Sequence, residues 1–303
     1  MKLLTFLNNG DYQLGVVTEK GILDVASALI DLPRQHGYSV PMTVHEVIDG
    51  GEAAVSRLDQ FTTQALDIAG EDCSYLLDEA KLTLGPCVTH PNKIICVGLN
   101  YRKHAVETNA AIPEFPILFN KFNNTLAGHG DDIPLPRVTK KVDYEAELVI
   151  VIGKSAKYVT KEDALNHIFG YCNVNDLSAR DLQLRTQQWL LGKSCDKFSP
   201  LGPYLVTTDE IEKPNDLEIK CTVNGEIRQH SNTSDMIFQC DEIVSYISQH
   251  MTLVPGDIIL TGTPEGVVLG YPVDQQIYLK DGDIVTIEIE KLGKLTNRLV
   301  KED

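Results

Sequence analysis

The sequence lacks any apolar run of the roughly 18 residues that a membrane-spanning helix requires, so we expect no membrane segment. Its first apolar stretch, residues 1–7, turns polar at Asn8. That stretch is too short for the hydrophobic region of a signal peptide and is more typical of a first β-strand. These two absences predict a cytoplasmic protein.

The cysteines lack a pairing pattern. There are seven of them, an odd number, and no two have C-x-x-C spacing. This excludes a disulfide framework and a structural zinc site of the usual kind. Several cysteines lie in apolar runs such as Ile94–Val97, which predicts that they are small buried hydrophobic residues.

Positive charge is scarce. The 27 Lys and Arg residues are outnumbered by 43 Asp and Glu residues, which gives a net charge of −16. Such a surface repels a phosphate backbone, so we expect no nucleic-acid partner. An anionic small-molecule substrate is still compatible with this charge, because a bound cation reverses the local sign inside a cleft.

The 303 residues are 43% hydrophobic, enough for a sizeable core, and contain no internal repeat. Residues 1–84 are expected to form a small mixed domain, with a hairpin at Asn9–Gly10 and helices at 43–50 and 52–70. A linker rich in proline and glycine follows at 85–92, and a second, larger domain at 93–303.

The larger domain is expected to contain more strands than helices. Strands are predicted at 93–98, 144–152, 217–223, 226–229, 258–261 and 284–290, and helices at 161–168, 177–191 and 239–250. Strands and helices do not alternate regularly, so the sequence predicts an α+β, β-rich fold with antiparallel or mixed pairing.

An acidic pair begins one face of the 144–152 strand. Because side chains alternate along a strand, Glu145 and Glu147 share a face that turns aliphatic at Val149 and Val151. Two carboxylates at the edge of a buried surface are costly unless a positive charge compensates them. They lie about 7 Å apart along the strand and can converge on one cation. The alternative is an ordinary solvated strand face.

Asp176 is the candidate third ligand. It follows the apolar run 168–175 and precedes the predicted helix 177–191, where an Asp also serves as an ordinary N-cap. Three carboxylates with open positions suit magnesium, manganese or calcium better than zinc or copper.

Further polar residues lie near these acids in the sequence. His104 and Glu107 are three apart, so on one helical turn the carboxylate can orient the imidazole as a general base or form a plain surface pair. Arg180 and Gln183 are also three apart, and a guanidinium there can bind a substrate carboxylate or remain exposed. Thr263 lies in a glycine-rich turn that lacks the Gly-Lys-Ser/Thr of a phosphate-binding loop.

Taken together, these motifs resemble the fumarylacetoacetate hydrolase family. The matching strings occur in the family's order and are Val97–Tyr101, His104 with Glu107, Asp143–Leu148, Asn175–Gln183, Gly192–Ser194, and Pro255–Asp257 with Thr261–Gly266. They cover about residues 93–300, and residues 1–84 resemble the small N-terminal domain of many members.

The resemblance implies a fumarylacetoacetate hydrolase-like β-roll and a homodimer. It implies magnesium or manganese, with calcium possible, on Glu145, Glu147 and Asp176. His104 and Glu107 would form a dyad on a segment that closes over the site, with Lys193 as a further catalytic residue. Substrate contacts would come from Arg180, Gln183 and Thr263.

Three functions are compatible with that resemblance. The first is a metal-dependent hydrolase that cleaves a carbon–carbon bond in an acylpyruvate-like diketo acid. The second is an oxaloacetate decarboxylase or a 2-oxo acid isomerase that uses the same site. The third is a metal-containing binding protein, which has no use for the complete His104, Glu107 and Lys193 set.

Overall fold

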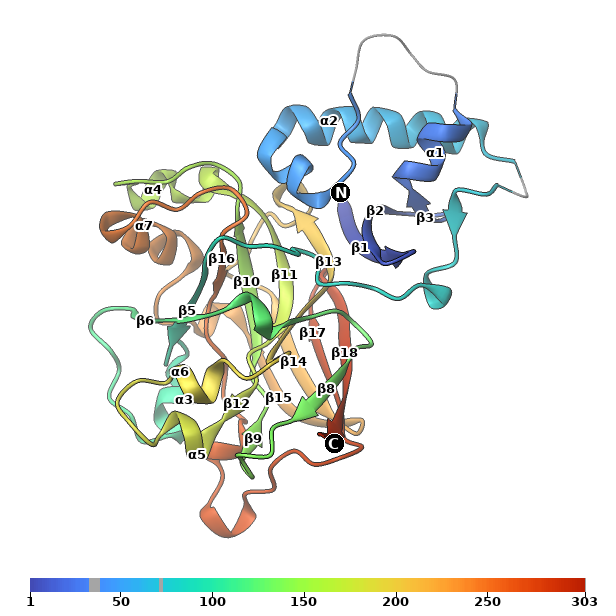
Figure 1. Ribbon diagram of the computed structural model, residues 1–303. Helices are drawn as coiled ribbons and strands as arrows, with labels where there is room; N and C mark the ends of the chain where they lie inside the picture. The colour runs from blue at the N-terminus through green and yellow to red at the C-terminus, as the bar shows by residue number, and fades with distance from the viewer. Residues whose placement is uncertain (33–38, 71–72, 303) are drawn as a thin grey trace.

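The computed structural model describes residues 1–32, 39–70 and 73–302 (Figure 1). Its largest sheet is mostly antiparallel. In spatial order it contains β4 (Leu76–Leu77), β3 (Gly21–Asp24), β2 (Asp11–Thr18), β1 (Lys2–Asn8), β13 (Ser199–Thr207), β11 (Ile168–Asn175), β10 (Ala146–Ile152), β16 (Ile258–Leu260), β5 (Ile94–Gly98) and β6 (Ile117–Lys121), with β7 (Leu126–Ala127) paired to β13.

Two further sheets complete the strand-rich part. The five-stranded sheet contains β15 (Glu226–Asn232), β14 (Glu218–Val223), β17 (Ile284–Ile289), β18 (Gly293–Lys301) and β8 (Asp132–Leu135). A two-stranded ladder pairs β12 (Ser178–Ala179) with β9 (Val142–Asp143). Parallel pairs occur at β16–β5, β13–β7 and β18–β8, so the expected β-rich, mixed α+β architecture is confirmed.

The α-helices are short apart from two. They are α1 (Val25–Asp31), α2 (Val44–Ile68), α3 (Arg102–Glu107), α4 (Lys161–Ala164), α5 (Arg180–Gln183), α6 (Leu190–Lys193) and α7 (Cys240–His250). The predictions at 239–250 and, in its first half, at 161–168 are confirmed by α7 and α4. Among the described residues, no helix combines the length and hydropathy needed to cross a bilayer.

The N-terminal segment continues the large sheet. Its hairpin turns at Asn9 and Gly10, both with positive φ, as predicted. The two predicted helices form α2, which breaks at Gly51 where φ is 54°. Strand β1 pairs with β13, so this segment and the rest of the chain are joined by backbone hydrogen bonds (Figure 1). The predicted domain boundaries stay a prediction, and residues 33–38, 71–72 and 303 within them lie outside the described part.

Strand β10 is buried on both faces and lies at the centre of the protein. Leu148 and Ile150 pack into one hydrophobic core, and Val149 and Val151 pack into another that also holds side chains of the N-terminal segment. The alternation predicted from the sequence is therefore correct. The acidic start of β10 is the place where one of these buried faces becomes polar.

The predicted helix at 177–191 is wrong. That segment instead forms β12, the single turn α5, an exposed stretch at 184–188 and the start of α6. The apolar spacing favoured a helix, but Arg180 and Gln183 are held by buried polar partners that a continuous helix would not reach. The predicted strand at 144–152 also begins two residues late, at Ala146, so Glu145 lies in the connection between β9 and β10.

Candidate active site

Three buried carboxylates meet where strand β10 begins beside the end of strand β11. Ala146 pairs with Asn175, so Glu145 just before β10 lies beside Asp176 just after β11, and the Asp176 N–H donates to the Glu145 carbonyl at 2.9 Å. Glu147 lies within β10 itself. One oxygen from each of the three side chains lies within 4.8 Å of the others, and all three residues are buried.

Two lysines partly neutralise this triad. The Lys193 Nζ lies 2.5 Å from Glu145 Oε2 and 2.7 Å from Asp176 Oδ2. The fully buried Lys121 pairs with Asp176 Oδ1 and donates to the Phe198 carbonyl at 2.7 Å. Three carboxylates and two lysines leave one negative charge, and the adjacent Arg180 and Asp143, which pair with each other, add one charge of each sign and do not change that sum. A buried net negative charge is unfavourable without a further cation.

The uncompensated charge falls on Glu147. Among the described residues it has no Lys, Arg or His ion-pair partner, and its Oε2 accepts the Gly262 N–H at 2.7 Å. Burial, together with Asp176 and Glu145, raises its pKa well above the usual value. Burial would also raise the pKa of Glu145, but Lys193 and Arg180 outweigh it and hold that pKa at about 2.

These residues fit a divalent metal ion. Three carboxylates supply hard oxygen ligands, and a 2+ charge would change the sum over the triad and its two lysines from −1 to +1. The ion would then pair with Glu147, which has no ion-pair partner of its own among the described residues and only the Gly262 N–H as a hydrogen-bond donor. This is the same triad that the sequence predicted.

Arg180 is the first residue of α5 and is buried beside the triad. Its Nε donates to Asp143 at 2.9 Å, and its Nη1 contacts Glu145 Oε1 at 2.8 Å and the Gln183 side-chain oxygen at 2.9 Å. Its Nη2 is buried and has no hydrogen-bond partner among the described residues. A buried N–H group without a partner is costly, so this atom is suited to a ligand oxygen.

His104 and Glu107 form the predicted pair on the short helix α3. The His104 Nδ1 lies 2.7 Å from Glu107 Oε1, and Glu107 Oε2 accepts the Gly266 N–H at 2.9 Å. A carboxylate only accepts, so the Nδ1 carries the proton and the Nε2 of a neutral ring is free to take one. The surface-pair alternative does not hold for His104, whose side chain is 7% exposed.

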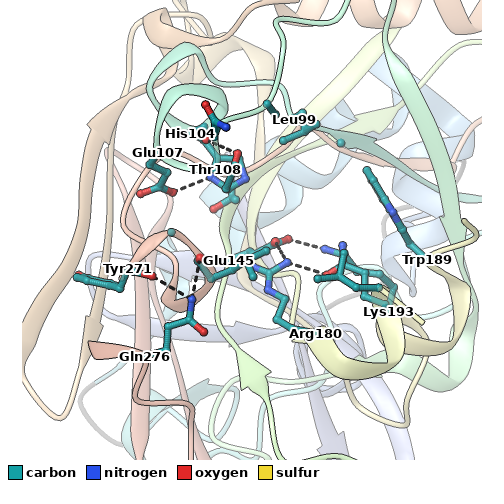
Figure 2. A pocket seen from close by; sticks show the side chains of 18 of the residues that line it. Leu99, His104, Glu107, Thr108, Glu145, Arg180, Trp189, Lys193, Tyr271 and Gln276 are labelled. Atoms are coloured by element: carbon teal, nitrogen blue, oxygen red, sulfur yellow. Dashed lines mark hydrogen bonds and ion pairs between the residues drawn. The ribbon is translucent and has the colours of Figure 1, made fainter. Parts of the chain in front are cut away.

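One cavity of about 680 Å³ brings these groups together (Figure 2). Figure 2 shows His104 and Glu107 on one side, facing Glu145, Arg180 and Lys193 on the other. Eight of the nine predicted site residues line it: His104, Glu107, Glu145, Glu147, Arg180, Gln183, Lys193 and Thr263. The ninth, Asp176, is fully buried beneath it.

Several residues of the site could not be predicted from the sequence, because no local pattern identifies them. Lys121 reaches Asp176 only through the pairing of distant strands. Gln229 on β15 donates to Thr263 at 2.9 Å and accepts the Ala146 N–H at 2.9 Å. Trp189, the only tryptophan, lines the cavity and packs edge-on against Phe119, with ring centroids 5.3 Å apart.

Residues 93–300 match the family model described as fumarylacetoacetate (FAA) hydrolase C-terminal. The chain belongs to the fumarylacetoacetate hydrolase family. It is 42% identical to the mitochondrial oxaloacetate tautomerase of Xenopus laevis over 274 residues. The matched region covers 90% of this chain and 82% of that protein. The match confirms the family that the sequence motifs indicated.

Two solved structures match over the full length of both chains. The fumarylacetoacetate hydrolase of psychrophilic Exiguobacterium antarcticum is 35% identical, with a TM-score of 0.82. The maleylpyruvate hydrolase of Sphingobium sp. SYK-6, solved in complex with manganese(II) and pyruvate, is 30% identical, with a TM-score of 0.79. The fold predicted from the resemblance is therefore confirmed, and the protein is an enzyme of this family with an acidic triad suited to a divalent metal ion.

Proposed function

We propose that the protein is a divalent-metal-dependent isomerase that interconverts the enol and keto forms of a short 2-oxo dicarboxylic acid of the oxaloacetate type. The observation that carries the proposal is the His104–Glu107 pair, which opens into the same cavity as the acidic triad. Tautomerisation needs a group that moves a proton and a site that accepts negative charge, and the cavity supplies both. The name of the Xenopus laevis relative supports the same reaction.

In this proposal Glu145, Glu147 and Asp176 hold the ion, which would be magnesium or manganese, with calcium as a further candidate. Bound there, the ion supplies a Lewis acid that lowers the cost of negative charge on the 2-oxygen of the substrate. The manganese and pyruvate in the Sphingobium relative support a metal ion and a 2-oxo acid in this kind of site.

The cations of the chain orient the substrate. The free Nη2 of Arg180 donates to a substrate carboxylate, while Gln183 fixes the guanidinium plane through its 2.9 Å hydrogen bond. Lys193 lines the cavity and adds a second positive charge for an anionic substrate. Thr263, held by Gln229, lines the same cavity and contributes a hydroxyl group.

His104 moves the proton. In the direction from enol to keto, the C3 carbon gains a proton and the enol hydroxyl loses one, so a single imidazole can exchange protons with the substrate. Glu107 keeps the ring in one tautomer through Nδ1 and thereby leaves Nε2 as the exchanging atom.

Hydrolysis of an acylpyruvate-like diketo acid is the second candidate. It is the function that the family resemblance put first, and the volume of the cavity favours it, because about 680 Å³ exceeds what a four-carbon acid fills. The maleylpyruvate hydrolase relative supports it too. His104 would then activate a water molecule, and decarboxylation of oxaloacetate would need the triad and a proton donor only.

The three reactions differ in their products, which NMR distinguishes on one sample of manganese-loaded protein. We expect the enol form of oxaloacetate to become the keto form faster than in buffer. Pyruvate and carbon dioxide from oxaloacetate would instead show a decarboxylase, and cleavage of an acylpyruvate to pyruvate and a carboxylic acid would show a hydrolase. A cytoplasmic location and a homodimer stay proposals from the sequence.

A further inference from the structure

Asp143 is a fully buried carboxylate that lies beside the site without lining its cavity. It belongs to β9, and its register partner on β12 is Ser178, so the ladder places it next to Arg180, where α5 begins. Strand β9 leads directly to Glu145, and β12 begins two residues after Asp176. Asp143 is therefore adjacent to the metal triad but is not part of it.

Its two oxygens accept three hydrogen bonds. Oδ2 accepts from Arg180 Nε at 2.9 Å and from the Leu269 N–H at 3.0 Å, and Oδ1 accepts from the Val268 N–H at 2.9 Å. One donor belongs to the guanidinium and two belong to the 3₁₀ turn η6 (Val268–Gly270). A single side chain thus connects Arg180 with that turn.

The turn connected in this way forms a wall of the cavity. Residues 269–273 line it, and Gln276 holds them by donating to the carbonyls of Leu269 and Tyr271 at 3.2 and 2.9 Å (Figure 2). Gly270 packs so closely on Glu107 that an added Cβ would lie 2.5 Å from its carboxyl carbon. The wall therefore also backs the carboxylate that orients His104.

We propose that Asp143 is a positioning residue, which holds the Arg180 guanidinium and the 268–270 wall in one fixed arrangement so that an anionic ligand meets both. Resting on the proposed function, this assigns Asp143 to substrate binding and not to proton transfer. Its bond to Nε directs the free Nη2 of Arg180, and its bonds to the turn fix the part of the cavity wall that begins at Leu269.

Asp143→Asn tests this proposal. An amide has one accepting oxygen and one donating nitrogen, so a donor must face either Arg180 or the turn. The probe is oxalate, a dicarboxylate that cannot enolise, titrated into manganese-loaded protein with Trp189 fluorescence as the signal. We expect the Kd of oxalate to rise by roughly tenfold to a hundredfold, the range for losing one charged hydrogen bond.

A matched control is Asp181→Asn. Asp181 lies one residue after Arg180 and accepts from the Thr139 hydroxyl and the Lys140 N–H, outside the cavity. Its variant is expected to bind oxalate like the wild type. In turnover with oxaloacetate, Asp143→Asn is expected to raise KM far more than it lowers kcat, because it removes ligand binding and leaves His104 in place.

If Asp143→Asn does not fold, Val268→Pro tests the same proposal. Val268→Pro removes one N–H donor to Asp143 at the first position of a helical turn, where proline is tolerated, and Val267 already has the extended backbone that precedes proline. It is expected to weaken oxalate binding while the bond between Asp143 and Arg180 remains.

Two results would overturn the proposal. One is unchanged oxalate affinity in folded Asp143→Asn or, if that variant does not fold, in Val268→Pro. The other is a loss of manganese affinity, measured by electron paramagnetic resonance, as large as the loss of oxalate affinity, because Asp143 would then act on the triad. Neither readout needs turnover, so the proposed isomerase activity can fail while this inference stands.

Discussion

At the scale of single residues, the site consists of buried charged side chains. Their net negative charge favours binding of a cation. Strand alternation singled out Glu145 and Glu147, and the position after an apolar run made Asp176 the candidate third ligand, but only the family resemblance favoured a metal site over a solvated face and an N-cap. The sequence could not identify Lys121 or Asp143 as partners of these charges. Both act through contacts between distant segments, and a lysine or an aspartate without a motif has no sequence signal.

His104→Ala tests the proton-moving role at this scale. A positioned general base contributes roughly 10²- to 10⁴-fold to a rate, and the rate of enol-to-keto conversion is expected to fall by that factor. Manganese affinity is expected to stay unchanged, because His104 is not one of the three proposed ligands. His167→Ala is the matched control, since His167 also pairs with a carboxylate, Asp163, at 3.4 Å but lies outside the cavity. Equal effects of the two variants would count against the assignment.

At the scale of elements, helix propensity gave a wrong prediction in the segment that carries site residues. The stretch 177–191 has helix-like apolar spacing, yet it folds as β12, α5 and α6 so that Arg180, Gln183 and Lys193 all reach the cavity. By contrast, the hairpin at Asn9–Gly10 and the break of α2 at Gly51 follow from turn chemistry alone and were predictable.

Gly192→Ala tests how tightly α5 and α6 fit together. A Cβ at Gly192 would lie 2.4 Å from the Gln183 backbone nitrogen, so the methyl group must displace the turn that carries Arg180. Overpacking of this kind costs about 1–3 kcal/mol, and we expect a lower melting temperature together with weaker oxalate binding. Gly70→Ala is the control, because its Cβ would meet no atom within 4 Å. A Gly192→Ala protein as stable as this control would contradict the packing.

At the scale of the whole molecule, two partly buried histidines couple stability to pH. His45 accepts the His90 N–H at 3.1 Å, and His129 accepts the Thr296 N–H at 3.1 Å, so each imidazole is needed in its neutral form. Burial lowers the pKa of both below 6.5. The unfolded chain therefore binds more protons just below pH 6.5, and stability falls as the pH drops through that window.

The melting temperature between about pH 7 and pH 5 measures this effect. The double variant with His45→Gln and His129→Asn keeps an accepting oxygen at each position but does not titrate, so its melting temperature is expected to depend less on pH. If the wild type and the double variant show the same pH dependence, these two histidines are not its source.

The measurement that tests the central claim most directly is the rate of enol-to-keto conversion of oxaloacetate during titration of metal-stripped protein with manganese. For the wild type we predict no activity above buffer without metal and full activity at about one ion per chain, since the triad is one site. For folded Glu147→Gln, which lacks the one carboxylate of the triad without an ion-pair partner among the described residues, we predict no recovery at the same manganese concentrations. Full activity in the metal-stripped wild type, or equal recovery in Glu147→Gln, would contradict the account.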